Sequence, residues 1–302
     1  MSIRIKMAAI SGAVLICALL ILIFFYTSSS NGNLKSTKAT STPSEAPFPQ
    51  DPIRDWSVLD PAVPSQALLI ESLNDGFPFF RYKIHEAWPM ASLTKLLTAV
   101  VVTEQIGLNT KIPITQRAVE TEGIAGDLKS GEVYTARDLL KIMLMVSSND
   151  AAAAFEEFGG GKEAFVNMMR KKAREIGLQE TIVNDASGLD DNNTTTADDM
   201  LKLLKYVIEK DPDIISWTRL QTFPVQAIND VNSRIITNID SLVVDPDFLG
   251  GKTGTSPKAG ENLAAVFSFG TRRVGVIILG SKDRIREVHD MLRWVKQAYK
   301  VQ

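Results

Sequence analysis

The chain has 302 residues, of which 45% are hydrophobic and 23% charged, and its formal net charge is −2. This composition is typical of a globular protein with one substantial core or two subdomains, and it lacks the basic balance expected of a nucleic-acid-binding protein. A single cysteine, Cys17, excludes an intramolecular disulfide and a cysteine-based metal site. The two histidines, His85 and His289, give poor support for a Ser-His-Asp triad or a histidine-rich metal site. We therefore expect no metal and no cofactor.

The N-terminal segment predicts a membrane anchor. Residues 7–26 form an uncharged, mostly apolar run, about as long as a helix that crosses a bilayer. Arg4 and Lys6 precede it, so residues 1–6 are expected in the cytoplasm and the rest of the chain outside. A cleaved signal peptide is the competing interpretation, although its apolar core is normally shorter and ends at a small-residue cleavage site. Residues 27–55, rich in Ser, Thr, Pro, Asn and Gly, predict a flexible tether to a domain at 56–302.

The first predicted elements of that domain lead to a possible nucleophile. Two strands at about 67–70 and 77–84 are joined by a turn, and a helix is expected from Ser92 to about Ile106. Residues three apart on a helix share a face, so a neutral amine on Lys95 could take a proton from Ser92. Free N–H groups of the first turn could face an oxyanion. Taken alone, the same four residues are explained more simply by a serine that caps a helix and a solvated lysine.

A second candidate group interrupts the next helical region. A capping sequence at 135–138 begins a strongly apolar helix, and Ser147-Ser148-Asn149-Asp150 separates it from a helix at 151–158. Burying polar groups without partners costs about 1–3 kcal/mol each, so their place between two buried helices requires a role. Further helices are expected at about 162–176 and 196–209, with a turn-rich loop at 184–192 between them.

The last third of the chain predicts strands and a terminal helix. Strands are expected at about 221–228, 233–239, 261–270 and 273–280, followed by a helix at about 285–299. Strands at both ends of the domain with helices between them indicate an α+β fold with one mainly antiparallel sheet. Residues 250–255, Gly-Gly-Lys-Thr-Gly-Thr, stand ahead of the 261–270 strand, where glycines allow a ligand to approach the backbone. A phosphate-binding P-loop is excluded because Lys252 leads into a strand rather than a helix.

Three motifs together point to one family. Ser92-x-x-Lys95, Ser147-x-Asn149 and Lys252-Thr253-Gly254 occur in the order known from class A β-lactamases and penicillin-binding proteins. With residues 89–99, 184–189 and 283–286, the chain from about 60 to 302 resembles the low-molecular-mass D-alanyl-D-alanine carboxypeptidases and their endopeptidase relatives. The resemblance implies a DD-peptidase/β-lactamase-like α+β fold. It also implies attack on the D-Ala-D-Ala bond of peptidoglycan stem peptides through an acyl-enzyme, with β-lactam antibiotics acylating the same serine.

The resemblance also implies roles for the motif residues. The catalytic group would be Ser92 as nucleophile, Lys95 as its base and Ser147 as proton relay to the leaving amine. The substrate-binding group would hold the substrate amide, its carboxylate and the oxyanion: Asn149, Lys252, Thr253, Gly254, Thr255 and Arg286. The oxyanion hole would use the backbone N–H groups of Ser92 and Thr255. Arg286 resembles the arginine that helps hold the terminal carboxylate, and a solvated residue at a helix start is the alternative role.

Two other functions stay open from the sequence. A class A-like β-lactamase would need a Glu-x-x-Leu-Asn loop, and the nearest string, 175–179, ends in Gln. A membrane-tethered wall-binding protein without turnover would have no reason to keep a buried lysine beside a serine. The best-known carboxypeptidases carry a second, β-rich domain and a membrane-lying helix. About fifty residues follow Lys252 here, so we expect the N-terminal anchor to provide membrane attachment on the extracytoplasmic side.

Overall fold

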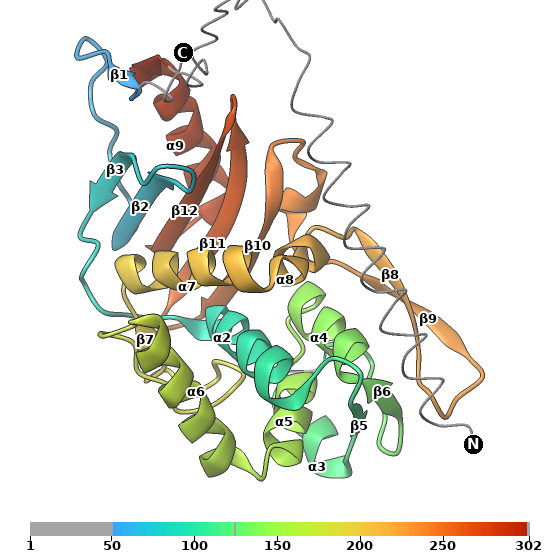
Figure 1. Ribbon diagram of the computed structural model, residues 1–302. Helices are drawn as coiled ribbons and strands as arrows, with labels where there is room; N and C mark the ends of the chain where they lie inside the picture. Colours follow the sequence, from blue (N-terminus) through green and yellow to red (C-terminus); the bar gives the residue numbers. More distant parts are fainter. Residues whose placement is uncertain (1–50, 124, 301–302) are drawn as a thin grey trace, which may run out of the picture. The chain divides into compact units, whose positions relative to one another are not determined.

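The computed structural model describes residues 51–123 and 125–300 (Figure 1). The cytoplasmic segment, the membrane anchor and most of the tether expected from the sequence lie outside these residues. Across the described part of the chain, no helix combines the length and the apolar character needed to span a bilayer.

A five-stranded antiparallel sheet forms the centre of the domain. Its strand order is β10-β11-β12-β2-β3, so the early strand β2 pairs with the late strand β12 in the middle. The strands cover the following residues: β2 Ala67–Ser72, β3 Pro78–Tyr82, β10 Phe248–Ser256, β11 Gly260–Phe269 and β12 Arg272–Ser281. The mainly antiparallel sheet expected from the sequence is therefore confirmed. All six residues of β2 are buried, which fits a strand covered on both faces.

The two faces of the sheet belong to two separate apolar cores. Because successive side chains of a strand point to opposite faces, Leu68 and Ile70 pack with α9 (Arg284–Ala298), whereas Leu69 packs with the helical part of the domain. The helix α7 (Ala197–Lys210) covers that second face at β12 and β2, and Figure 1 shows α9 and α7 on opposite sides of the sheet.

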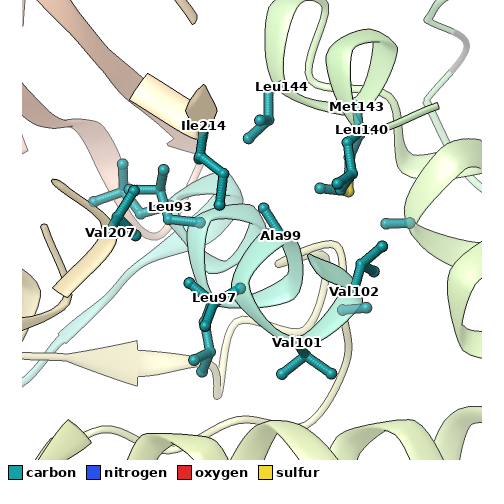
Figure 2. Packing of buried hydrophobic residues seen from close by; sticks show 14 of the residues in the cluster. Leu93, Leu97, Ala99, Val101, Val102, Leu140, Met143, Leu144, Val207 and Ile214 are labelled. Carbon is teal, nitrogen blue, oxygen red and sulfur yellow. The ribbon is translucent and has the colours of Figure 1, made fainter. Parts of the chain in front are cut away.

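The helical part surrounds α2 (Thr94–Val101), all eight residues of which are buried. It packs against α4 (Ala136–Met145), α6 (Lys162–Ile176) and α7, and α5 (Asn149–Phe158) and the short α8 (Pro212–Thr218) pack in turn against α4. Figure 2 shows how side chains from different helices converge here, among them Ala99, Leu140, Val207 and Ile214. This core fixes the position of α2. It therefore also fixes Ser92, just before the helix, and Lys95, in its first turn.

Short elements complete the domain and connect its main parts. Two-stranded pairs are formed by β1 (Ile53–Arg54) with β13 (Tyr299–Lys300), β4 (Trp88–Pro89) with β7 (Thr194–Thr195), β5 (Lys111–Pro113) with β6 (Val133–Thr135), and β8 (Thr222–Gln226) with β9 (Ser233–Thr237). The helix α3 covers Gln116–Val119, and a 3₁₀ turn, η3, covers Ser241–Val244.

Three expectations from the sequence are corrected at this level. The helix expected from Ser92 to Ile106 consists of a 3₁₀ turn, η1 (Ala91–Leu93), the α-helix α2, and a π-helical turn, η2 (Val102–Ile106). Neither start is capped by a side chain, so the cap expected of Ser92 is wrong. The domain also begins earlier than residue 56, because β1 lies inside the last residues of the expected tether and pairs with β13.

Candidate active site

The motif serine and lysine meet at the start of α2. Lys95 Nζ lies 3.0 Å from Ser92 Oγ, the contact that proton transfer between them requires. Ser92 is half-buried and so can be reached by a ligand, whereas Lys95 is completely buried. The preceding residue, Ala91, adopts a φ of +45°, a conformation that costs a non-glycine residue about 1–3 kcal/mol. The surrounding core therefore holds Ser92 in a strained turn rather than in a regular helix.

Two further groups hold the Lys95 amine in place. Nζ contacts Asn149 Oδ1 at 2.7 Å and donates to the carbonyl oxygen of Ser187 at 2.6 Å. The amide of Asn149 is itself oriented because its Nδ2 donates to the carbonyl oxygen of Glu122 at 2.8 Å. All three contacts of the amine are oxygen atoms, so its geometry is fixed from three directions.

Ser147 is presented by the bend between α4 and α5. Its φ is +59°, again unusual for a non-glycine residue, and the next residue, Ser148, caps α5 by accepting a hydrogen bond from the N–H of Ala151. This bend aims Ser147 Oγ at Lys252 Nζ, 3.1 Å away. Ser147, Ser148 and Asn149 thus have the partners that the cost of burying them demands, whereas Oδ1 of the buried Asp150 has no hydrogen-bond partner among the described residues.

Lys252 lies inside the edge strand β10, which runs past the start of α2. A Cβ atom on Gly254 would lie 2.8 Å from the carbonyl oxygen of Met90 and 3.2 Å from the backbone nitrogen of Ser92. Only glycine allows the strand to come so close to the serine. Lys252 Nζ also donates to the carbonyl oxygen of Thr253 at 2.8 Å. The sequence places the motif ahead of a strand, whereas the structure makes it part of one.

The loop at 184–192 closes the site from the other side. Asp185 is buried and accepts hydrogen bonds from the backbone N–H groups of Ser187, Gly188 and Asp190. A Cβ atom on Gly188 would lie 1.9 Å from the carbonyl oxygen of Ala91, so the loop touches the turn that carries Ser92. These bonds fix the Ser187 carbonyl group that holds Lys95.

Arg286 does not reach this site, contrary to the expectation from the sequence. Its side chain is 81% exposed and pairs with Asp290 on its own helix. Arg284 takes the expected place, because its Nη1 donates to Thr255 Oγ1 at 2.6 Å and to the carbonyl oxygen of Gly254 at 3.2 Å. Residues two apart on a helix point in nearly opposite directions, so only one of the two arginines can face β10.

Burial lowers the pKa of both lysines. Burial, followed by the nearby charge of Lys252, lowers the pKa of Lys95 well below its usual range, and Asp185 opposes this effect. Burial likewise lowers the pKa of Lys252 to about 7; Asp240 raises it and Arg284 lowers it further. A lowered pKa makes a neutral amine available at Lys95 near neutral pH, as a general base needs.

Asp240 is a site residue that the sequence did not reveal. It is 8% exposed, Oδ1 accepts from the N–H of Leu242, and Oδ2 is buried without a hydrogen-bond partner among the described residues. The neighbouring Ile239 N–H donates to the carbonyl oxygen of Met145, which ties this segment to the bend of Ser147. No motif marks Asp240, since it stands on an irregular connection between β9 and β10.

In the part of the chain that the structure describes, no three His, Cys, Asp or Glu side chains lie together in a way that could bind a metal ion. The site consists instead of two serine–lysine pairs and an amide. A buried amine beside a serine hydroxyl is the arrangement in which lysine can take the place of histidine as the base of a serine nucleophile.

The chain belongs to the peptidase S11 family, described as D-alanyl-D-alanine carboxypeptidases, whose family model matches residues 57–283. The chain is 30% identical to the D-alanyl-D-alanine carboxypeptidase DacC of Escherichia coli over 256 residues, which are 80% of this chain and 63% of DacC. It is 32% identical to a D-alanyl-D-alanine endopeptidase of Haemophilus influenzae over 200 residues, 64% of this chain and 68% of that protein.

Solved structures show the same fold. A D-alanyl-D-alanine carboxypeptidase from Mycobacterium tuberculosis superposes with a TM-score of 0.74 at 25% identity, covering 83% of this chain and 99% of that one. The chain thus spans nearly all of that structure but 63% of the length of DacC.

Proposed function

We propose that this protein is a serine-type D-Ala-D-Ala carboxypeptidase, or a closely related endopeptidase, that acts on peptidoglycan stem peptides and is acylated by β-lactam antibiotics. The observation that carries the proposal is the convergence of two serine–lysine pairs, 3.0 Å and 3.1 Å in length, at one half-buried serine. Relatives named carboxypeptidase and endopeptidase support both forms of the reaction.

Acylation would begin with the Ser92–Lys95 pair. Neutral Lys95 accepts the proton of Ser92 Oγ as that oxygen attacks the carbonyl carbon of the penultimate D-Ala. The negative charge that develops on the carbonyl oxygen is stabilised by the backbone N–H groups of Ser92 and Thr255. Gly254 supports this arrangement because it brings β10 against the Ser92 backbone. The Asn149 amide would bind the substrate amide on the acyl side of the bond.

Departure of the leaving amine would use the second pair. Ser147 would donate its hydroxyl proton to the leaving nitrogen and take up the proton that Lys95 received from Ser92, so that both groups return to their starting state. Lys252, in contact with Ser147 Oγ, favours that transfer electrostatically. The terminal carboxylate of the leaving D-Ala would be held by Lys252, Thr253 and Arg284. Arg284 replaces Arg286 in this role because it contacts Thr255. Water then hydrolyses the ester on Ser92 to complete the turnover.

Location outside the cytoplasm is part of the proposal. The apolar run at 7–26, preceded by Arg4 and Lys6, supports a single-pass anchor with the catalytic domain on the side of the cell wall. If the run is an anchor, the full-length protein should remain with membranes after a high-salt wash, and a variant lacking residues 1–26 should not. Release of the full-length protein by salt would contradict the anchor.

A β-lactamase finds less support from the site. Glu175, the nearest counterpart to a deacylating glutamate, pairs with Lys172 at 2.7 Å at the end of α6. Within the described residues, the hydrogen bonds of Ser92 and Lys95 do not involve it. We therefore expect a long-lived penicilloyl-enzyme rather than rapid hydrolysis. A wall-binding protein without turnover remains the alternative from another functional class.

One panel of assays separates these functions. The purified protein is given a stem pentapeptide, a cross-linked stem-peptide dimer and penicillin, and free D-Ala, monomer and penicilloate are measured. We expect D-Ala release or dimer cleavage, with penicilloate no more than stoichiometric. Lys95→Ala should reduce each rate at least about 100-fold, as loss of a general base does. Rapid penicilloate turnover would instead establish a β-lactamase, and no product from any substrate would contradict catalysis.

A further inference from the structure

A pocket of about 410 Å³, lined by several charged side chains, opens beside the catalytic group. Two of its lining residues, Asn149 and Ser187, are those that contact Lys95 Nζ. The other walls come from α3, from α5, and from the start of α6. The residues of β10 and Arg284 do not line it. A substrate chain that leaves Ser92 past Asn149 therefore enters this pocket.

The direction of the substrate follows from the proposed function, on which this inference rests. The cations Lys252 and Arg284 would hold the carboxylate of the leaving D-Ala on the β10 side of Ser92. The acyl part of the substrate must then depart on the side of Asn149. The side chain of the residue that precedes the scissile D-Ala-D-Ala unit is the part of the substrate that can reach into the pocket.

The charges of the pocket favour a cationic side chain. Its lining contains four carboxylates, Glu120, Glu156, Glu157 and Asp185, against the two cations Arg117 and Lys162. Most of these groups already have partners. Glu157 accepts a hydrogen bond from the Thr115 hydroxyl group and lies 3.6 Å from Arg117. Asp185 accepts hydrogen bonds from backbone N–H groups of its own loop. Glu120 is exposed and bonded to Gln116.

Glu156 is the carboxylate with capacity for a ligand. Its Oε1 accepts from the N–H of Ala186 at 2.7 Å, and Oε2 has no hydrogen bond to any described residue. Lys162 and Arg117 lie close enough to influence it but not in ion-pair contact. Burial first, and then the charge of Asp185, raise the pKa of Glu156, so a cation placed at Oε2 would relieve an unfavourable environment.

We propose that this pocket is the acyl-side subsite of the enzyme and that Glu156 selects a substrate side chain ending in a primary ammonium group. The group would be bound at Oε2 by a charge-assisted hydrogen bond. Asn149 then has two roles, since it orients Lys95 and also lines the subsite. A substrate whose side-chain amine is acylated loses the charge and should bind less well.

The test compares two peptides that differ only in this group, Nα-acetyl-Lys-D-Ala-D-Ala and its Nα,Nε-diacetyl counterpart. Binding is measured by calorimetry to the Ser92→Ala variant, which cannot be acylated. We expect the free amine to bind about tenfold more tightly, equivalent to ~1.4 kcal/mol. Adding Glu156→Gln should reduce the ratio of the two affinities to about one. The matched control is Glu163→Gln on α6, an exposed residue outside the pocket, which should preserve the ratio.

The ratio separates recognition from a structural effect. If Glu156 only anchors the Ala186 N–H, its substitution weakens both peptides alike and leaves the ratio intact, which would overturn the proposal. Equal affinity of the two peptides for the Ser92→Ala variant with Glu156 intact would overturn the proposal as well. D-Ala release and cleavage of the cross-linked dimer by the wild-type protein are measured in parallel. Preferential binding without either product would contradict the proposed function and leave the subsite standing.

Discussion

Replacing Gly188 with alanine should impair acylation by moving the loop that holds Lys95. The glycine has a φ of +86°, and an added Cβ would lie 1.9 Å from the carbonyl oxygen of Ala91. The two backbones must separate by about 1.5 Å to reach an ordinary contact. That shift displaces the neighbouring Ser187 carbonyl group, which accepts from Lys95 Nζ at 2.6 Å. A misplacement of this size costs about 100-fold in rate.

The matched control is Gly177→Ala at the end of α6. Gly177 has a φ of +85°, but an added Cβ would find nothing within 4 Å. Both variants should lose about 1–2 kcal/mol of unfolding free energy from the left-handed conformation of an alanine, and Gly188→Ala should lose more because of the clash. The assay is the second-order rate of acylation by a fluorescent penicillin, with unfolding followed in urea. Acylation of folded Gly188→Ala at the rate of Gly177→Ala would refute the reasoning.

Three further variants test the carboxylate site, the charge network and the core. Arg284→Ala should lower kcat/KM for a D-Ala-D-Ala peptide at least about tenfold, whereas Arg286→Ala should stay within about twofold, because only the former lies beside β10. The charged form of Lys252 would bind the substrate carboxylate, and Asp240 raises the pKa of Lys252. Asp240→Asn should therefore shift the alkaline limb of the kcat/KM profile to lower pH by ~1 unit. Leu140→Ala should lose about 2–5 kcal/mol of unfolding free energy in urea, since Leu140 is completely buried.

Each of these variants has an outcome that contradicts its premise. Equal effects of the two arginine substitutions would show that the phase of α9 is wrong. For the pH profile, Asp245→Asn is the control, since Asp245 stands on the same connection but bonds His289 at the surface. A profile of Asp240→Asn that matches this control would remove Asp240 from the network. An unchanged urea midpoint of Leu140→Ala would place that side chain outside the core.

The regular elements could be predicted because their patterns are local. The strands β11 and β12 and the helices α6, α7 and α9 each lie within two residues of the ranges expected from the sequence. The short helix α8 was missed even though Pro212 stands at its first turn, a known preference of helix starts. Seven residues are too few for a clear apolar period.

The motifs located the centre of the site but not its surroundings. Ser92, Lys95, Ser147, Asn149 and Lys252 are brought together as the resemblance implied. The choice between Arg284 and Arg286 could not be made from the sequence. It depends on the rotational phase of α9, which is set when Asp283 caps that helix.

Contacts from irregular segments were also beyond the sequence. Asp240 lies twelve positions before Lys252, in a connection without periodic pattern, and its effect on Lys252 arises only from tertiary packing. The Ser187 carbonyl group that accepts a hydrogen bond from Lys95 belongs to the backbone, so no side-chain motif can predict it. The turn-rich loop at 184–192 was recognised, but its contact with Ala91 depends on the fold.

The identity of the acylated residue is the most direct test of the account. The protein is treated with penicillin, digested with trypsin and examined by mass spectrometry. Cleavage after Lys83 and Lys95 yields a peptide of residues 84–95 with one serine, Ser92. We predict that this peptide gains the mass of one penicillin in the wild-type protein and stays unmodified in Ser92→Ala. Lys95→Ala removes one cleavage site, so the corresponding peptide covers residues 84–111, again with Ser92 as its one serine, and it should stay unmodified at matched times. An adduct on any other residue, or no adduct under saturating penicillin, would contradict a Ser92 nucleophile activated by Lys95.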